Sequence, residues 1–186
     1  RKRAIELAGE VWNRREEFII HEEHYAPEQA IRVAGKAEEL SVFITDSGDN
    51  PTAGAPGDNT YFLKMVVESD LLDVVYAAVP DPEAVKDCLD QGLGKSVELN
   101  VGNKIDRLYG RPFAVKGVVE HIHEPVNGHD ATIVTVKTKN THLILTDKRK
   151  VFESPRDFES AGIDPLEHKT VVVKLGYLFP ELYDIA

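Results

Sequence analysis

The side chains best suited to chemistry in this sequence are gathered between Asp46 and Thr60, in the stretch DSGDNPTAGAPGDNT. Carboxylate and amide oxygens dominate it, and such groups could hold a divalent cation or orient a neighbouring ligand. The alternative is a surface turn, because Gly, Pro, Asn and Asp are also the ordinary residues of turns. The candidate cleft residues in this loop are Asp46, Asp49, Asn50, Gly54, Gly57, Asp58 and Asn59.

The elements on either side of this loop favour a ligand-binding role. The apolar run 41–45 predicts a buried strand before it, and Asp58, Asn59 and Thr60 are N-cap candidates for a helix after it. Open α/β sheets bind ligands at the carboxyl ends of strands, and a helix N-terminus offers free N–H groups to an anion. The loop is not a phosphate-binding P-loop, since no Gly-Lys-Ser/Thr follows it.

Three further polar residues lie at predicted strand ends and are candidates for the same cleft. Thr146 and Arg149 follow the apolar run 141–146, although the polar exit of a hairpin explains them equally well. Lys174 ends the run KTVVVK, and its alternative role is an ion pair with one of the many carboxylates.

A metal site formed within this chain would have to use its histidines. His121 and His123 are two residues apart on a predicted strand, a spacing that zinc sites use, and His129 lies in the next loop. Strand alternation predicts that the first two share a face with Val115 and Val119. The sequence places no Cys or other His beside them, so we expect no metal in this chain and keep these three histidines as the alternative.

The composition argues against several classes of partner. The 186 residues carry a formal net charge of -10, which repels phosphate backbones, so we expect no nucleic-acid binding. No apolar run approaches the ~18 residues of a membrane span, so we expect no membrane partner. The single cysteine, Cys88, lies in a predicted helix and favours a buried thiol in a reducing compartment, here the cytoplasm.

The order of the predicted elements favours an α/β fold. Helices are predicted over 3–20, 27–40, 60–69, 82–91 and 157–161, and strands over 41–45, 72–79, 96–101, 113–123, 132–138, 141–146 and 169–174. The β-α-β-α order of residues 41–92 predicts parallel strands, and the hairpin at 132–146 predicts an antiparallel insertion. We therefore expect a mixed sheet in a single domain, with Trp12 and Phe18 in core or domain-interface contacts.

Four segments follow one another as they do in a known family. They are the loop DSGDNPTAGAPGDNT, AAVPDPEAVKDCLDQGLGKSVELNVGNKID, YGRPFAVKGVVEHIHE and LILTDKRKVFESPRDFESAGIDPLEHKTVVVK. In this order they resemble the C-terminal domain of the MlrC-like family of metallopeptidases, also called the microcystinase C or microcystin-degradation family. The resemblance covers nearly the whole chain.

This resemblance implies a role in a zinc-dependent hydrolase. The family's zinc ligands, an Asp and two His, lie in an N-terminal domain that this chain does not include. The chain alone would then be inactive and zinc-free, and would add a cleft wall for cleaving a peptide or amide bond. The implied partners are that N-terminal domain, a peptide or small amide substrate and, as a further option, a second copy of the chain. A non-catalytic binding or interdomain module is the alternative.

Two departures from the family pattern bear on the substrate. The family's three glycines are Thr52, Ala53 and Gly54 here, which predicts a stiffer loop. The family's Lys-Ser-x-x-His-Phe-Arg ending is replaced by KLGYLFP over residues 174–180. If the lost His and Arg bind substrate in other members, this protein acts on a different substrate, and microcystin is not assumed.

Overall fold

The computed structural model describes residues 1–19, 23–126 and 128–186. The strands are β1 (Val42–Thr45), β2 (Val74–Pro80), β3 (Ser96–Val101), β4 (Phe113–His123), β5 (Ile133–Lys137), β6 (Thr141–Thr146) and β7 (Thr170–Val173). The α-helices are α1 (Lys2–Asn13), α2 (Pro27–Lys36), α3 (Tyr61–Glu68), α4 (Pro82–Gln91), α5 (Pro155–Ser160) and α6 (Pro180–Tyr183). Short 3₁₀ turns occupy Arg15–Glu17, Ser47–Asp49, Pro51–Ala53 and Pro165–Glu167.

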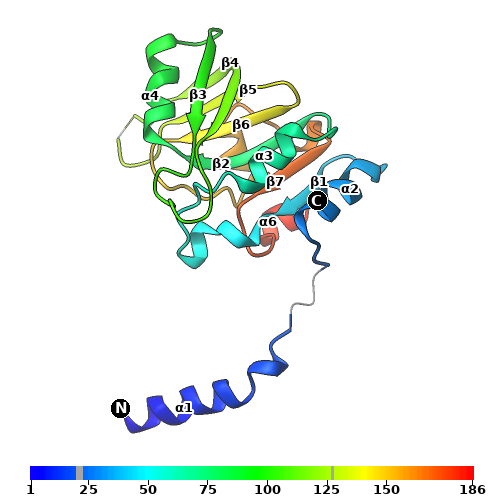
Figure 1. Cartoon of the computed structure of the whole chain (residues 1–186), viewed down its shortest axis with the longest axis vertical. Coiled ribbons are helices and arrows are strands. Elements are labelled where there is room, and N and C mark those ends of the chain that lie inside the picture. The colour runs from blue at the N-terminus through cyan, green and yellow to red at the C-terminus, as the bar shows by residue number, and fades with distance from the viewer. Residues whose placement is uncertain (20–22, 127) are drawn as a thin grey trace.

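The strands form one mixed sheet in the order β1-β7-β2-β6-β5-β4-β3 (Figure 1). β1, β7, β2 and β6 run parallel, whereas β6, β5, β4 and β3 pair antiparallel. The predicted α/β class with a mixed sheet and an antiparallel insertion is confirmed. The predicted β-α-β-α unit supplies β1 and β2, but β7 comes from near the end of the chain and lies between them.

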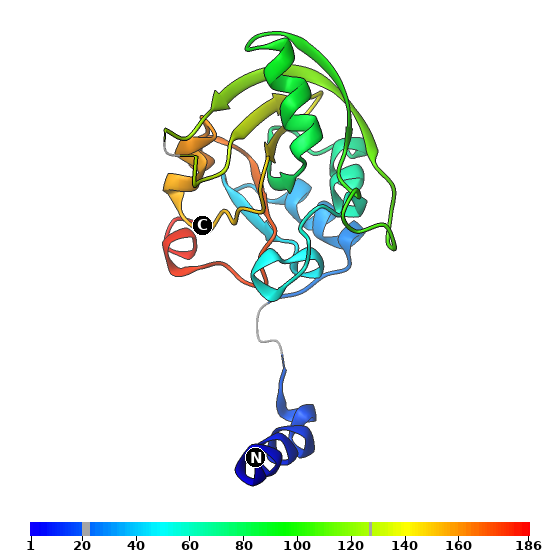
Figure 2. The ribbon, with the colours of Figure 1, turned by 90° about the vertical axis from the view of Figure 1, so that its left-hand side faces the viewer.

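Helices cover both faces of this sheet (Figure 2). α2, α3 and α4 bury Ala34, Leu63 and Cys88 in one apolar core, and α5 and α6 bury Phe158 and Leu182 in the other. Successive residues of a strand point to opposite faces, so a strand in the middle of such a layer must be apolar throughout. β2, with the sequence VVYAAVP, is buried at every residue for this reason.

The outer strand β3 has only one covered face. Its residues alternate between exposed and buried over SVELNV, and Val97, Leu99 and Val101 join the core beneath α4. This alternation is the sequence pattern of a strand with one face in water. It explains why the bounds predicted for β3 agree with the structure.

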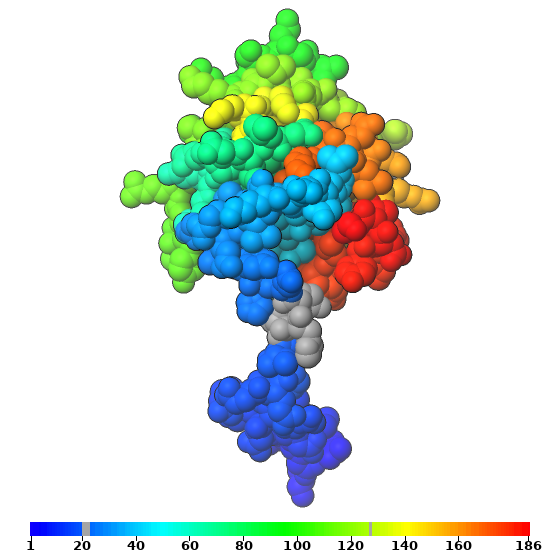
Figure 3. Space-filling model, turned by 90° about the vertical axis from the view of Figure 1, so that its right-hand side faces the viewer, coloured from blue at the N-terminus to red at the C-terminus, as the bar shows by residue number. Residues whose placement is uncertain are grey.

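The N-terminal helix differs from its prediction in length and surroundings. α1 ends at Asn13 rather than continuing to residue 20, which lies outside the described residues. It buries no residue, and the space-filling view shows it set off from the main body of the domain (Figure 3). Trp12 and Phe18 are each 67% exposed, so they are not part of the core. In the described part of the chain, no helix is both long and apolar enough to cross a membrane.

Candidate functional site

The loop from Asp46 to Thr60 lies at the carboxyl edge of the parallel strands. It leaves β1 with the Asp46 N–H donating to the Val173 carbonyl at 2.8 Å, next to the end of β7. Gly57 lies against the last residue of β2, since a Cβ there would be 3.6 Å from Pro80. The loop therefore crosses the ends of three neighbouring strands, where open α/β sheets place their ligands.

Asp49 fastens the two ends of this loop together. Its Oδ1 accepts the Gly57 N–H at 2.9 Å, and its Oδ2 accepts the Asn59 N–H at 2.7 Å. Lys174 donates to the same Oδ2 at 2.9 Å, and Asp49 is only 7% exposed. With both oxygens occupied by partners from the domain itself, this carboxylate shapes the loop.

Lys174 holds the loop from beneath. Its ammonium group is buried, donates to the Asn59 carbonyl at 3.0 Å and lies 3.5 Å from Asp46 Oδ2. It also lies 5.7 Å from the centre of the Tyr76 ring, a cation–π arrangement. Burial, together with the Asp46 and Asp49 carboxylates, raises the pKa of Tyr76 well above its usual value. Lys174 therefore forms the ion pair that was its alternative role, and it does so directly beneath the candidate loop.

Asp58 is wholly buried and fixes a second loop, residues 103–111, against the first. Its Oδ2 accepts the N–H groups of Lys104 and Ile105 at 2.8 and 2.6 Å, and its Oδ1 accepts that of Asp106 at 3.1 Å. A carboxylate that accepts several backbone N–H groups is held firmly in position. Asp58 is therefore a structural anchor and not an N-cap of α3.

The two asparagines of the loop also satisfy backbone groups. Asn50 Oδ1 accepts the Thr52 N–H at 2.9 Å and the Thr52 hydroxyl at 2.7 Å. Asn59 Oδ1 accepts the Tyr61 N–H at 2.8 Å, and its Nδ2 donates to the Tyr109 carbonyl at 2.8 Å. Asn59 thus bridges the start of α3 to the 103–111 loop.

The triplet Thr52, Ala53 and Gly54 forms a tight turn. Pro51–Ala53 is a 3₁₀ turn, and Gly54 follows with a φ of 96°. Only the last position needs the left-handed conformation that glycine adopts without strain. Gly57, at φ 83°, is needed for a second reason, because a Cβ there would lie 2.8 Å from Pro51.

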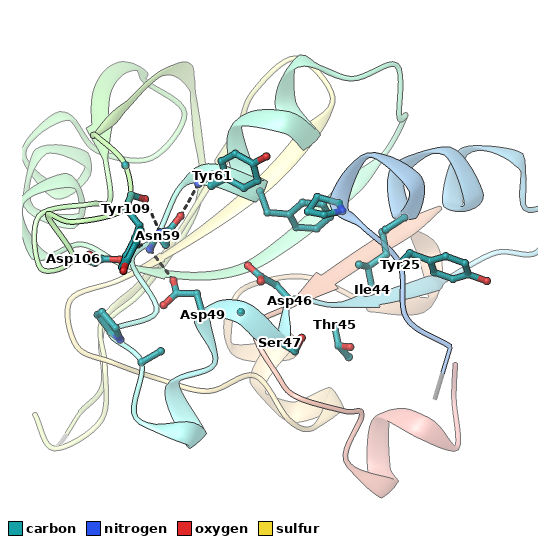
Figure 4. A pocket seen from close by; sticks show the side chains of 17 residues that line it. Tyr25, Ile44, Thr45, Asp46, Ser47, Asp49, Asn59, Tyr61, Asp106 and Tyr109 are labelled. Atoms are coloured by element: carbon teal, nitrogen blue, oxygen red, sulfur yellow. Dashed lines mark hydrogen bonds between the residues drawn. The ribbon is translucent and has the colours of Figure 1, made fainter. Parts of the chain in front are cut away.

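A cavity of about 770 Å³ opens beside this loop (Figure 4). Asp46 and Ser47 face it from the end of β1, and Asp106 and Tyr109 face it from the 103–111 loop. The other lining residues are Tyr25, Pro27, Ala30, Ile44, Thr45, Gly48, Asp49, Ala55, Pro56, Asn59, Tyr61, Phe62 and Gly110. The wall thus combines carboxylates with aromatic rings, a pairing suited to a ligand with polar and apolar parts.

Asp46 differs from the other carboxylates of the loop. Among the described residues, no backbone N–H donates to its side chain, which is 17% exposed and has Lys174 as its ion-pair partner. It combines an available oxygen with a fixed position at the end of a strand. The structure thus separates Asp46 from Asp49 and Asp58, which the sequence grouped together.

Of the predicted cleft residues, Asp46, Asp49 and Asn59 line the cavity, and the others lie around it. Thr146 is buried at the end of β6, and its hydroxyl has no hydrogen-bond partner among the described residues. Arg149 extends toward the loop from outside, with its Nη1 3.5 Å from the Ala55 carbonyl. Both lie at the carboxyl edge as expected, but around the loop and not within the pocket.

His121 and His123 do not share a face with Val115 and Val119. The register of β4 against β5 shifts between Val119 and His121, a β-bulge that reverses the alternation. Ile122 therefore follows Val119 on the first core, and His121 packs on the other side against Gly162. The predicted common face is wrong for His121 and His123 because strand alternation alone cannot reveal a bulge.

Three tyrosines and one carboxylate of the cavity wall were missed by sequence reasoning. Tyr25 precedes α2, Tyr61 begins α3, and Asp106 and Tyr109 belong to the 103–111 loop. The polar run NKID at 103–106 was the available signal, since its backbone N–H groups need partners. Nothing in the sequence indicated that Asp58 would supply them across more than forty positions.

Comparison with known proteins places this fold in a family. The family described as "MlrC C-terminus" matches residues 44–186. The chain belongs to this family. The resemblance found in the sequence is therefore confirmed, and the match begins inside β1 and includes the whole cavity loop.

The MlrC C-terminal domain is a part of the longer relatives it matches. One curated relative, "Microcystinase C" of a Sphingomonas species, is 29% identical over 77% of this chain, which covers 30% of that protein. A crystal structure described as "Putative metallopeptidase" from Mesorhizobium sp. BNC1 has a TM-score of 0.79 and 21% identity. It matches 97% of this chain, which covers 38% of that protein. Both relatives thus contain extensive chain beyond this domain.

Proposed function

We propose that this MlrC C-terminal domain forms one wall of the substrate cleft of a zinc-dependent hydrolase that cleaves peptide or amide bonds. The observation that carries the proposal is the cavity at the carboxyl edge, where Asp46 presents a positioned carboxylate beside aromatic side chains. Relatives that are longer and include a metallopeptidase assignment support the reaction class.

The zinc would be held by an N-terminal domain outside this chain. Among the described residues, the cavity wall contains neither His nor Cys, so its donors do not fit a hydrolytic zinc site by themselves. When bound, zinc polarises the scissile carbonyl and supplies a hydroxide. This chain would bind and orient the substrate, with Asp46 accepting a hydrogen bond from an N–H group of the substrate. We place the protein in the cytoplasm on its single buried thiol, with self-association as an option.

The test compares Asp46→Asn with Asp87→Asn in a protein that carries both domains. Asp46→Asn removes the Asp46 charge from the cavity wall and keeps the shape of the side chain. Asp87 is exposed on α4, so Asp87→Asn serves as the matched control. We expect Asp46→Asn to lower kcat/KM on a fluorogenic peptide mixture at least tenfold. The free energy of unfolding should change by less than about 1 kcal/mol.

The competing function is an interdomain structural module without a cleft. It is favoured by Asp49 and Asp58, whose carboxylates are used by the domain's own backbone. Unchanged turnover in Asp46→Asn would overturn the cleft proposal. If Asp46→Asn instead lowers the free energy of unfolding enough to account for its lower kcat/KM, the result would support the structural module.

A further inference from the structure

A second group of ligand-type side chains lies at the opposite edge of the sheet. Asp73, His142 and His168 each offer one donor atom, and these atoms all lie within 4.8 Å of one another. His168 Nδ1 is 2.8 Å from Asp73 Oδ1, and His142 Nε2 is 3.7 Å from the same oxygen. The two imidazole rings are 4.7 Å apart between centroids.

The parallel sheet brings these residues together from distant parts of the chain. Val74 of β2 is in register with both Thr141 of β6 and Thr170 of β7. Asp73 precedes the first of these strands, and the two histidines lie beside the starts of the other two. β2 has seven residues, and at ~3.3 Å per residue the cluster lies roughly 20 Å from the Asp46 cavity.

The spacing of the donors fits a tetrahedral metal ion. Zinc binds imidazole nitrogen and carboxylate oxygen at about 2.0–2.2 Å, so tetrahedral ligand atoms are about 3.3–3.5 Å apart. The distances to Asp73 Oδ1, 2.8 and 3.7 Å, lie on either side of that value, and the three donor atoms lie within 4.8 Å of one another. Binding would therefore need the side chains to adjust by roughly half an ångström to an ångström.

A carboxylate behind His142 fixes the orientation of its ring. Glu120 Oε2 is 2.7 Å from His142 Nδ1. A carboxylate only accepts, so Nδ1 carries the proton and donates a hydrogen bond to Glu120. This leaves the Nε2 lone pair directed toward the cluster. Histidine ligands of metals in proteins are typically held by such a carboxylate, which sets the tautomer and raises the basicity of the ring.

A cation already occupies the position next to His142 Nε2. The Lys137 ammonium group contacts that nitrogen directly. An ammonium group has only donors, so Nε2 must accept, which agrees with the tautomer set by Glu120. A metal ion would have to displace this flexible side chain, and the site therefore contains its own competitor.

We propose that Asp73, His142 and His168 form a binding site for Zn²⁺ or a similar divalent transition-metal ion, with water as the fourth ligand. Two imidazoles and one carboxylate select such ions over Mg²⁺ and Ca²⁺, which prefer oxygen ligands. The site is separate from the cavity and from the zinc assigned to the N-terminal domain. It replaces the expectation that this chain has no metal site of its own.

The test titrates Zn²⁺ into this chain after chelator treatment. We expect one ion per chain, and at least tenfold weaker binding in His168→Ala and Asp73→Asn. The control is His129→Ala, at an exposed loop position, which should bind as the unmodified chain does. Co²⁺ should give the intense visible absorption of a tetrahedral site.

Lys137→Gln keeps the test decisive if a ligand variant fails to fold. It leaves the three ligands in place and removes the competing ammonium group, so we expect severalfold tighter Zn²⁺ binding. Absence of Zn²⁺ binding in the unmodified chain, or weaker binding in Lys137→Gln, would overturn the proposal. Because the readout is binding and not turnover, this result is independent of the cleft proposal.

Discussion

Replacing Asp58 by Ala should destabilise the domain far more than the same change at Asp46. The Asp58 carboxylate is fully buried and accepts the N–H groups of Lys104, Ile105 and Asp106. The Asp46 carboxylate accepts no backbone N–H among the described residues and keeps only a 3.5 Å ion pair. The two variants thus compare an anchoring carboxylate with one that lines a cavity.

The magnitude follows from the lost hydrogen bonds. Bonds to a charged acceptor contribute about 1.5–3 kcal/mol each, so three give an upper bound of about 4.5–9 kcal/mol. Water can reach the 104–106 backbone once the carboxylate is gone, since Ile105 is 62% exposed. We therefore expect a loss of about 3 kcal/mol in the free energy of unfolding for Asp58→Ala and below 1 kcal/mol for Asp46→Ala.

Urea unfolding followed by circular dichroism measures this difference. The only tryptophan, Trp12, is exposed on α1, so its fluorescence would not report on the core. With an m-value of about 2 kcal/mol/M, the midpoint of Asp58→Ala should fall by about 1.5 M. Equal midpoints for the two variants would refute the assignment of Asp58 as the anchor of the 103–111 loop.

Two further predictions concern buried groups. Asp49→Ala should cost about 3–5 kcal/mol, because the buried Lys174 ammonium loses its close carboxylate and keeps only the Asn59 carbonyl and the longer contact to Asp46. Lys174→Met should cost less. Urea unfolding compares the two variants, and a larger loss in Lys174→Met would contradict the reasoning. Burial raises the pKa of Cys88 from 9.0 to about 11, so roughly one thiol in a thousand is ionised at pH 8 and a disulfide reagent should label it only after unfolding. Since the folded pKa is the higher one, this thiol's contribution to stability is intact below pH 9.0, is lost as the pH rises to about 11, and stays lost above that. Labelling of the folded chain at pH 8 as fast as of the unfolded chain would contradict the burial.

The sequence predicted the bounds of individual helices and strands better than it predicted which strands lie side by side. The bounds of α4, β3, β4 and β6 agree with the structure, because capping residues, alternation and turn residues are local signals. The placement of β7 between β1 and β2 has no local signal, since it depends on which strands bury each other best.

In the candidate site too, local features were predictable from the sequence and long-range contacts were not. The sequence indicated the loop and its position after β1, but not which carboxylate was already committed to the backbone. The cluster at Asp73, His142 and His168 was missed because these residues are 69 and 26 positions apart in sequence, and only the strand register brings them together. The bulge in β4 misled the reading of His121 for a similar reason, since one inserted residue leaves no mark on the hydrophobic pattern.

The position of β7 also constrains the order in which this domain can fold during its synthesis on the ribosome. β1 emerges early, but its strand partner, Thr170–Val173, follows more than a hundred residues later. Lys174, which holds the Asp46–Thr60 loop from beneath, comes one residue after that strand. During synthesis β1 therefore has no strand partner, and the loop lacks its Lys174 contacts, until β7 and Lys174 have left the exit tunnel. Cavity formation is thus one of the final events in the production of the domain.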